Sequence, residues 1–196
     1  MNQSSAWPFH VDSQQDFAWV EDGFSKEECE KIKEIGLSMS LADGVVGNSV
    51  SYDKDESYRN SKISWIFPKE DTSWIFRRLT DVVGNLNARY FAFDLYGFVE
   101  GLQFSVYEAP SGKYDFHIDK AINGNIRKLS IVVLLSDENE YSGGDFEVLT
   151  GKKEQQCVRK QGTVLVMPSY ILHRVTEVTS GTRNSLVGWI TGPAFR

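Results

Sequence analysis

The sequence predicts a mainly β protein with supporting helices, built around a double-stranded β-helix, the jelly-roll core of cupin-like proteins. Two segments with helical periodicity occupy the first half of the chain. Many short β-branched or aromatic segments, separated by turn residues, fill the second half. This order of elements is typical of a jelly roll or a β-sandwich that helices support.

The chain length limits how many such units to expect. The 196 residues, of which 41% are hydrophobic and 13% aromatic, suffice for one well-buried core but not for two domains and a linker. We therefore expect a single domain over 1–196. Its helical support should cover about 1–100 and its jelly-roll core about 101–196.

The first expected helix follows a short strand. Residues 17–21 alternate between apolar and polar side chains, which is typical of a strand. Ser25 and Glu28 then form a capping-box pattern, in which each side chain can accept from the other residue's backbone N–H. We expect a helix over about 26–39, with one apolar stripe against a sheet.

A long polar segment separates this helix from the next elements. Residues 43–60 are rich in Gly, Ser, Asn and Asp and lack any period, so we expect an irregular loop that can serve as a lid. A strand is expected over 63–67. A second helix should begin after Asp71 or Thr72 and run to about Arg89.

The second half of the chain is expected to be β throughout. The Gly143-Gly144 pair predicts a turn with positive φ, and Ser180-Gly181 predicts another turn. The expected strands cover 102–107, 128–135, 145–149, 163–167, 171–178 and 185–191.

Charge and composition argue against several classes of partner. The net charge is -6, and no run of basic residues is longer than a pair, so we expect no nucleic-acid partner. No stretch approaches the roughly 20 apolar residues that span a bilayer, so we expect no membrane contact. Cys29 and Cys157 are far apart, and we expect free thiols and a cytoplasmic location.

Two of the three histidines lie in patterns that suit a metal ion. On a strand, residues i and i+2 point to the same face, so His117 and Asp119 can present an imidazole and a carboxylate to one ion. His173 can supply a third ligand, which completes the facial set that leaves an iron ion with open positions. On this pattern alone, His117 and Asp119 can equally be a surface histidine beside a solvated aspartate.

Arg183 and Tyr107 can bind an acid beside that metal. Arg183 opens an expected strand ten positions after His173, and a guanidinium pairs with a carboxylate through two hydrogen bonds. The far carboxylate of a dicarboxylate on iron would point toward such an arginine, and the phenol of Tyr107 can reach the same acid. Taken singly, Arg183 can be a solvated turn residue and Tyr107 a core tyrosine.

An ordered set of motifs joins these patterns. It resembles the prolyl 4-hydroxylase branch of the iron(II)- and 2-oxoglutarate-dependent dioxygenases, in its compact bacterial and phage-type form. An upstream segment, Tyr58-Arg-Asn-Ser-Lys-Ile-Ser-Trp65, is similar to one in the animal oxygen-sensing prolyl hydroxylases. The motifs are Gln103-Phe-Ser-Val-Tyr107, His117-Ile-Asp119, Arg127-Lys-Leu-Ser130, Tyr141-Ser-Gly-Gly144-Asp-Phe146, Pro168-Ser-Tyr170, His173-Arg-Val-Thr-Glu-Val178 and Gly181-Thr-Arg183 through Trp189.

The resemblance assigns roles to nine residues. One departure concerns Leu134, which stands where the animal oxygen sensors have a tyrosine, so a second hydrogen bond to the distal carboxylate must come from elsewhere. Thr163 is our candidate for that bond. The implied iron ligands are His117, Asp119 and His173, the implied 2-oxoglutarate contacts are Arg183 and Tyr107, and the implied substrate contacts are Arg127, Trp189, Trp65 and Arg59.

The resemblance also implies a reaction. Iron(II), 2-oxoglutarate and dioxygen would be the cofactor and co-substrates, with ascorbate as the reductant. The substrate would be a prolyl residue in a proline-containing peptide or protein, and the co-products would be succinate and carbon dioxide. Orientation of the reactants and exclusion of water would be the protein's part in this chemistry.

Three alternatives stay open at this point. The enzyme can act on a free amino acid or another small molecule, or the barrel can be a binding module without redox chemistry. A zinc hydrolase with the same three ligands would need a general base, and Glu108 is the nearest candidate. Because Glu108 follows Tyr107 on a strand, its side chain should point to the opposite face.

Overall fold

Two large antiparallel sheets, a small two-stranded sheet and two α-helices make up the fold of the computed structural model, which describes residues 15–47, 52–53, 55–119 and 125–195. The strands of the major sheet, in spatial order, are β1 (Ala18–Val20), β13 (Val164–Pro168), β9 (Arg127–Leu134), β15 (Val178–Thr191), β7 (Leu102–Glu108), β6 (Lys62–Ile66) and β2 (Ala42–Asp43), with β10 (Tyr141–Gly143) beside β15. The minor sheet is β12 (Gln155–Gln156), β11 (Phe146–Leu149), β14 (Leu172–Val175), β8 (Lys113–His117) and β5 (Arg59–Asn60).

Helix α1 (Lys26–Ser38) packs against the outer face of the major sheet. Its N-terminus carries the capping box that the sequence predicts between Ser25 and Glu28. Near its C-terminus, a Cβ on Gly36 would lie 2.3 Å from the ring of Phe104, so the close approach of helix and sheet requires glycine there. The hydroxyl of Ser64 on β6 donates to the Gly36 carbonyl at 2.8 Å and ties the helix to that strand.

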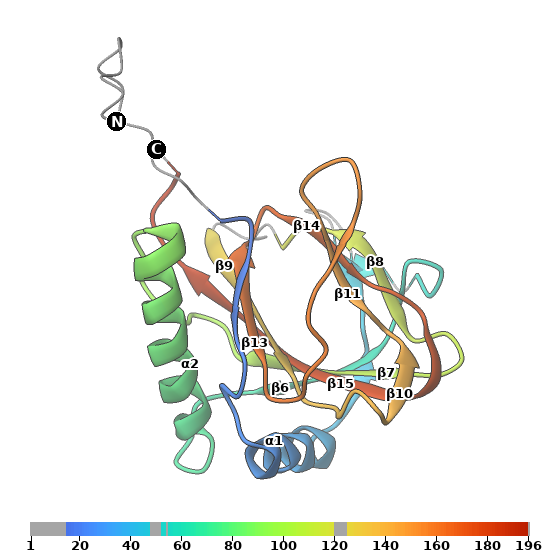
Figure 1. Cartoon of the computed structure of the whole chain (residues 1–196). Helices are drawn as coiled ribbons and strands as arrows, with labels where there is room; N and C mark the ends of the chain where they lie inside the picture. Colours follow the sequence, from blue (N-terminus) through green and yellow to red (C-terminus); the bar gives the residue numbers. More distant parts are fainter. Residues whose placement is uncertain (1–14, 48–51, 54, 120–124, 196) are drawn as a thin grey trace.

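Helix α2 (Ser73–Leu86) also covers the major sheet and continues into the π-helical turn η1 (Asn87–Phe91). The expected cap does not form. Thr72 is the N-cap residue, but its hydroxyl donates to Phe67 O and accepts from Lys69 N in the preceding turn. Figure 1 shows α1 and α2 on the major-sheet side, with β8, β11 and β14 across the barrel from them. No described helix is long and apolar enough to cross a membrane.

The major sheet separates two hydrophobic cores because its strands alternate. On β7, Leu102, Phe104 and Val106 face the helices. Tyr107 faces the other way, into the core between the two sheets. Both cysteines are buried free thiols, as predicted, one in each core, and burial raises the pKa of each to about 12.

The first hundred residues contribute more strand than the sequence predicts. The strand predicted over 63–67 is β6, which joins the major sheet, whereas β5, which the sequence did not predict, joins the minor sheet. The segment 43–60, expected to be irregular, forms the short strands β2, β5, β3 (Val46–Gly47) and β4 (Tyr52–Asp53). Its residues 48–51 and 54 lie outside the described part of the chain, so the lid stays a prediction.

The C-terminal strands also differ from the expected boundaries. The expected strand 171–178 ends at Val175, and β15 then runs unbroken from Val178 through the expected turn at Ser180-Gly181. Gly181 has φ 72, and a Cβ there would lie 2.1 Å from Glu140 O, so this glycine permits the pairing with β10. Gly143 and Gly144 have the positive φ predicted for them.

Candidate active site

The cavity between the two sheets has a volume of about 450 Å³. Its floor carries the predicted metal ligands, and its walls come from strands of both sheets. The sequence-predicted residues that line it are His117, Asp119, His173, Arg183, Tyr107, Arg127, Trp189, Trp65 and Arg59. Thr163 is not among the lining residues. Its buried hydroxyl has no partner among the described residues, and its part in co-substrate binding stays a prediction.

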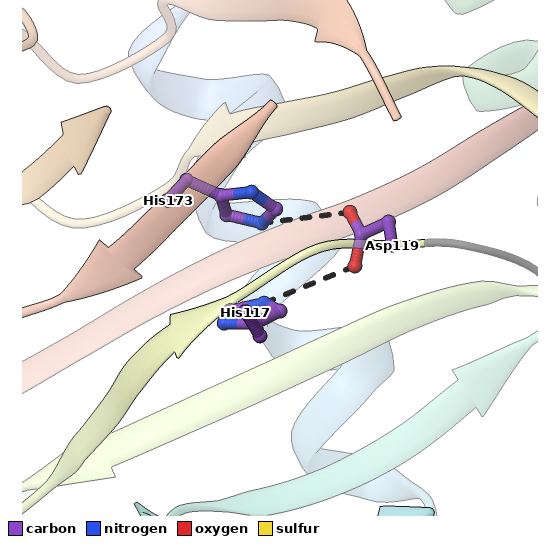
Figure 2. A group of neighbouring side chains, drawn as sticks. All are labelled: His117, Asp119 and His173. Atoms are coloured by element: carbon purple, nitrogen blue, oxygen red, sulfur yellow. Dashed lines mark ion pairs between the residues drawn. The ribbon is translucent and has the colours of Figure 1, made fainter. Parts of the chain in front are cut away.

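The three predicted ligands meet at one point of the cavity. All their ligand atoms lie within 4.8 Å of one another. The Nε2 atoms of His117 and His173 lie 3.8 Å and 3.5 Å from the two carboxylate oxygens of Asp119. Figure 2 shows both imidazoles directed at that carboxylate, one from β8 and one from β14. Two imidazoles and one carboxylate arranged in this way can hold a metal ion and leave part of its coordination sphere open.

Hydrogen bonds set both imidazoles in the form that binds a metal. Each Nδ1 lies beside a backbone carbonyl, that of Asp115 at 2.7 Å for His117 and that of Ile171 at 2.8 Å for His173. Because a carbonyl oxygen only accepts, each Nδ1 carries a proton, which leaves Nε2 as the ring nitrogen that can bind a metal. Burial, and then repulsion from His173, lowers the pKa of His117 to about 3, so its ring is neutral.

Asp119 is ionised although it is buried. Burial alone would raise the pKa of its carboxyl group, but the neighbouring imidazoles of His173 and His117 outweigh that effect and hold the pKa below its ordinary value. The sequence argument placed Asp119 on the same strand as His117, which is wrong, because β8 ends at His117. The Asp119 N–H instead donates to Ser169 O at 2.9 Å, which fixes the carboxylate beyond the strand end.

A bulge in β8 brings an unexpected aromatic ring to the metal ligands. Between the pairs His173–His117 and Val175–Tyr114, β14 advances two residues while β8 advances three. The extra residue turns Tyr114 to the same face as His117. Their rings stack at 3.5 Å with an interplanar angle of 13°, which restrains the His117 ring. Regular alternation would have placed these two side chains on opposite faces.

Arg183 lies deep in the major-sheet wall. It is 1% exposed, pairs with Tyr107 across β15 and β7, and holds its guanidinium carbon 5.3 Å from the ring centroid of that tyrosine. Its Nη1 donates to Ser185 Oγ at 3.3 Å, and its Nη2 has no partner among the described residues. Gly144 makes room for it, because a Cβ there would lie 3.0 Å from Arg183 Cδ. The sequence expected Arg183 at the start of a strand, whereas it lies within one.

The rim of the cavity combines aromatic and charged groups. The guanidinium of Arg127 lies 3.7 Å over the ring of Trp189, and the rings of Trp189 and Trp65 are 6.2 Å apart. Arg127 Nε donates to one carboxylate oxygen of Glu100 at 2.8 Å, and Nη2 donates to the other. Glu100 is a site residue that sequence reasoning missed, because it lies in a loop outside every motif.

Arg59 forms part of the opposite wall. It is 6% exposed and stacks over Tyr114, with its guanidinium carbon 4.4 Å from the ring centroid. The zinc-hydrolase alternative loses its general base, since Glu108 points outward as predicted and pairs with Lys62 at 3.1 Å on the surface. Sequence reasoning also missed Tyr114, whose position depends on the bulge in β8.

Comparison with known proteins identifies the part of the chain that carries this cavity. Residues 102–191 match the family model described as the 2OG-Fe(II) oxygenase superfamily. This part of the chain is therefore similar to 2OG-Fe(II) oxygenase domains. The family uses iron(II), 2-oxoglutarate and dioxygen. The three metal ligands and Arg183 all lie within the matched range.

Curated relatives of the oxygenase domain are described as PKHD-type hydroxylases. One from Synechococcus sp. (strain CC9311) is 44% identical over 80 residues, which are 40% of this chain and 36% of that protein. Another, from Prochlorococcus marinus, is 40% identical over 93 residues, which are 47% of this chain and 42% of that protein. The matches therefore span less than half the length of these relatives.

Solved structures share the fold over most of the chain. A prolyl-4-hydroxylase from Pseudomonas putida superposes with a TM-score of 0.68 at 19% identity, covering 91% of this chain and 94% of that one. A prolyl hydroxylase from Trichoplax adhaerens, in complex with a hypoxia inducible factor peptide fragment, gives 0.74 at 16% identity, covering 90% and 84%. These likenesses establish the jelly-roll architecture that the sequence predicts.

The residues present fit the family's cofactor and co-substrate. The donor set of two imidazoles and one carboxylate suits iron(II). The unpartnered Nη2 of Arg183 suits a dicarboxylate, because a buried guanidinium without an anion would carry a large desolvation cost. Co-substrate binding at this wall would supply that anion.

Proposed function

We propose that this protein is an iron(II)- and 2-oxoglutarate-dependent dioxygenase that hydroxylates a prolyl residue in a peptide or protein. One observation carries the proposal. A facial His-Asp-His set and a buried arginine with an unpaired Nη2 line the same cavity. Metal binding and dicarboxylate binding therefore belong to one site.

His117, Asp119 and His173 would hold the iron, which when bound supplies the activation of dioxygen for oxidation of 2-oxoglutarate and of the substrate. Arg183 would bind the distal carboxylate of 2-oxoglutarate through a charge-assisted pair, with Tyr107 as a second donor. One oxygen atom of dioxygen would enter the substrate hydroxyl and the other succinate, with release of carbon dioxide. Ascorbate would keep the metal reduced.

The rim is suited to an extended chain that carries proline. Arg127 uses Nε and Nη2 on Glu100, so its Nη1 is left to donate to a peptide carbonyl. Trp189, held flat under Arg127, offers an apolar face on which a pyrrolidine ring can pack. Among the solved structures with this fold, the one from Trichoplax adhaerens contains a peptide fragment. These features support a prolyl substrate within a polypeptide.

The test is co-product formation coupled to oxidation of a peptide. Proline-containing peptides would be incubated with protein, iron(II), 2-oxoglutarate and ascorbate, and analysed by mass spectrometry and a succinate assay. We expect a mass gain of one oxygen atom on proline, equimolar with succinate and absent in the Asp119→Ala variant. Succinate formation that no peptide stimulates, with faster turnover of free L-proline, would instead favour the small-molecule alternative.

A further inference from the structure

The guanidinium of Arg59 also lines the cavity, and the proposed function gives it no ligand. Arg59 Nε donates to Ser61 Oγ at 2.9 Å, and Nη1 donates to Val45 O at 3.1 Å. Its Nη2 is buried and has no partner among the described residues. Gly44 packs directly against the group, since a Cβ there would lie 2.6 Å from Arg59 Nε. The guanidinium is therefore fixed in a defined orientation and still has a donor unused.

Arg59 is held in the same way as Arg183. Each arginine donates to the serine two positions further along the chain, and each lies over the ring of a tyrosine. Each is at least nine-tenths buried, lines the cavity and leaves its Nη2 unpaired. The two walls of the cavity therefore hold an arginine in the same way. The proposed ligand of the arginine in the major-sheet wall, Arg183, is a carboxylate.

The acidic groups of the cavity do not neutralise Arg59. The acidic residues that line the cavity are Glu100 and Asp119. Glu100 pairs with Arg127, and Asp119 belongs to the metal set. Asp119 and bound 2-oxoglutarate together carry three negative charges, which balance iron(II) and Arg183. Among the described residues that line the cavity, no carboxylate then remains for Arg59, and a buried unpaired charge is costly.

We propose that Arg59 binds a carboxylate of the prolyl substrate, and this inference rests on the proposed function. Tyr114 stacks on both Arg59 and His117, at 4.4 Å and 3.5 Å, so a single ring separates the guanidinium from a metal ligand. A carboxylate on Arg59 would therefore lie in the same cavity as the candidate metal ligands. It can be the α-carboxylate of a terminal proline or the side chain of an adjacent acidic residue.

A matched pair of small probes tests this recognition directly. N-acetyl-L-proline and N-acetyl-L-prolinamide differ only in the carboxylate, and calorimetry with 2-oxoglutarate and zinc(II) in place of iron measures binding without turnover. We expect the wild-type protein to bind the acid at least about tenfold more tightly than the amide, because a charge-assisted pair replaces a neutral one. Equal affinities for the two probes would exclude the α-carboxylate of a terminal proline, and equal affinities together with no acid preference in the peptide pairs below would overturn the proposal.

Variants then assign the preference to Arg59. Arg59→Gln should abolish the preference for the acid and leave 2-oxoglutarate affinity unchanged, while Arg59→Lys should keep part of it. Arg127→Gln is the matched control, because it removes another cavity arginine and should preserve the preference. Equal loss of both probes in Arg59→Gln would contradict carboxylate recognition. Should Arg59→Gln not fold, the acid-to-amide ratio of the wild-type protein decides alone.

Peptides distinguish the two sources of the carboxylate. One pair ends in proline as a free acid or an amide, and a second pair places glutamate or glutamine beside an internal proline. Whichever pair shows the larger Arg59-dependent difference identifies the source, and no difference in either pair would count against the inference. Acid-selective binding without 2-oxoglutarate turnover would sink the proposed function alone. Turnover of neutral peptides without acid selectivity would sink the inference alone.

Discussion

The two arginine walls of the cavity repeat one construction on very different supports. Arg183 lies within β15, a 14-residue strand paired with β7 on one side and β9 on the other. Arg59 lies on β5, a two-residue strand at the edge of the minor sheet. The strand that carries Arg183 is held by neighbouring strands on both sides. An edge strand such as β5, and the loops next to it, unfold locally and vary in conformation more readily.

This difference suits the two ligands that we propose. An obligatory co-substrate needs the same geometry in every turnover, which a strand in the middle of a sheet provides. A substrate contact benefits from a support that can change without disturbing the core. The comparison predicts that changes at the proposed metal ligands impair binding of both 2-oxoglutarate and substrate. Changes at Arg183 should weaken 2-oxoglutarate binding alone, and changes at the rim should leave the ligand contacts of Arg183 and Arg59 intact.

Replacement of a proposed metal ligand should have the largest effect, because both proposed ligands, 2-oxoglutarate and the substrate, react at the metal. We expect His173→Ala to weaken iron(II) binding by at least about 100-fold, since even indirect supports of metal ligands are worth about 10- to 100-fold. Metal titration of the variant and of wild type, with circular dichroism as the folding control, measures this. Undiminished iron binding would remove His173 from the site.

Truncation of Arg183 should weaken co-substrate binding without weakening metal binding. Arg183→Ala should weaken 2-oxoglutarate binding by about 30-fold or more, because losing one partner of a buried charge pair costs roughly 2–5 kcal/mol. Iron affinity should barely change. Titration of both ligands gives the result, with Arg59→Gln as the matched control that should keep 2-oxoglutarate affinity. Equal losses for iron and 2-oxoglutarate would show a general structural role for Arg183.

A substitution at the rim of the cavity should affect ligand binding less than a substitution of Arg183 or Arg59. Glu100→Gln removes the charge that orients Arg127, but both side chains are partly exposed, so solvent screens the pair. We expect the KM for a peptide substrate to rise about two- to fivefold, with little change in kcat. Glu100→Asp should restore part of the loss. A large fall in 2-oxoglutarate affinity would contradict the separation of rim and walls.

The serines that orient the two arginines should give the smallest effects and compare the walls directly. Ser61→Ala removes the 2.9 Å bond to Arg59, and Ser185→Ala removes the 3.3 Å bond to Arg183. We expect a two- to threefold loss of N-acetyl-L-proline binding in the first variant and about a twofold loss of 2-oxoglutarate binding in the second. If each variant affected both ligands, the walls would not act independently.

Sequence reasoning identified most of the site because its signals are local in the chain. The His117-x-Asp119 pattern, His173 and Arg183 each stand next to a β segment, and all four side chains reach the cavity. Helix α1 was also readable from its capping box, which depends on residues three positions apart. Such features depend only on residues that are close together in the sequence, so they can be predicted without knowing the tertiary structure.

Other parts depended on which strands pair and in which register. The bulge that turns Tyr114 to the face of His117 exists only in the pairing of β8 with β14. Glu100 reaches Arg127 across 27 positions of sequence, and Ser180-Gly181 looks like a turn until β10 pairs with it. No local pattern encodes these contacts, because they form between strands that are distant in the chain.

By itself, the sequence determined the jelly-roll class, the three candidate metal ligands and the arginine that we propose for 2-oxoglutarate. Only the tertiary structure decided that Arg59 is buried, oriented by Ser61 and left with an unpaired donor beside Tyr114. The physical reason is that residue types fix which chemistry is possible, whereas burial and cross-strand register fix which charges remain unsatisfied.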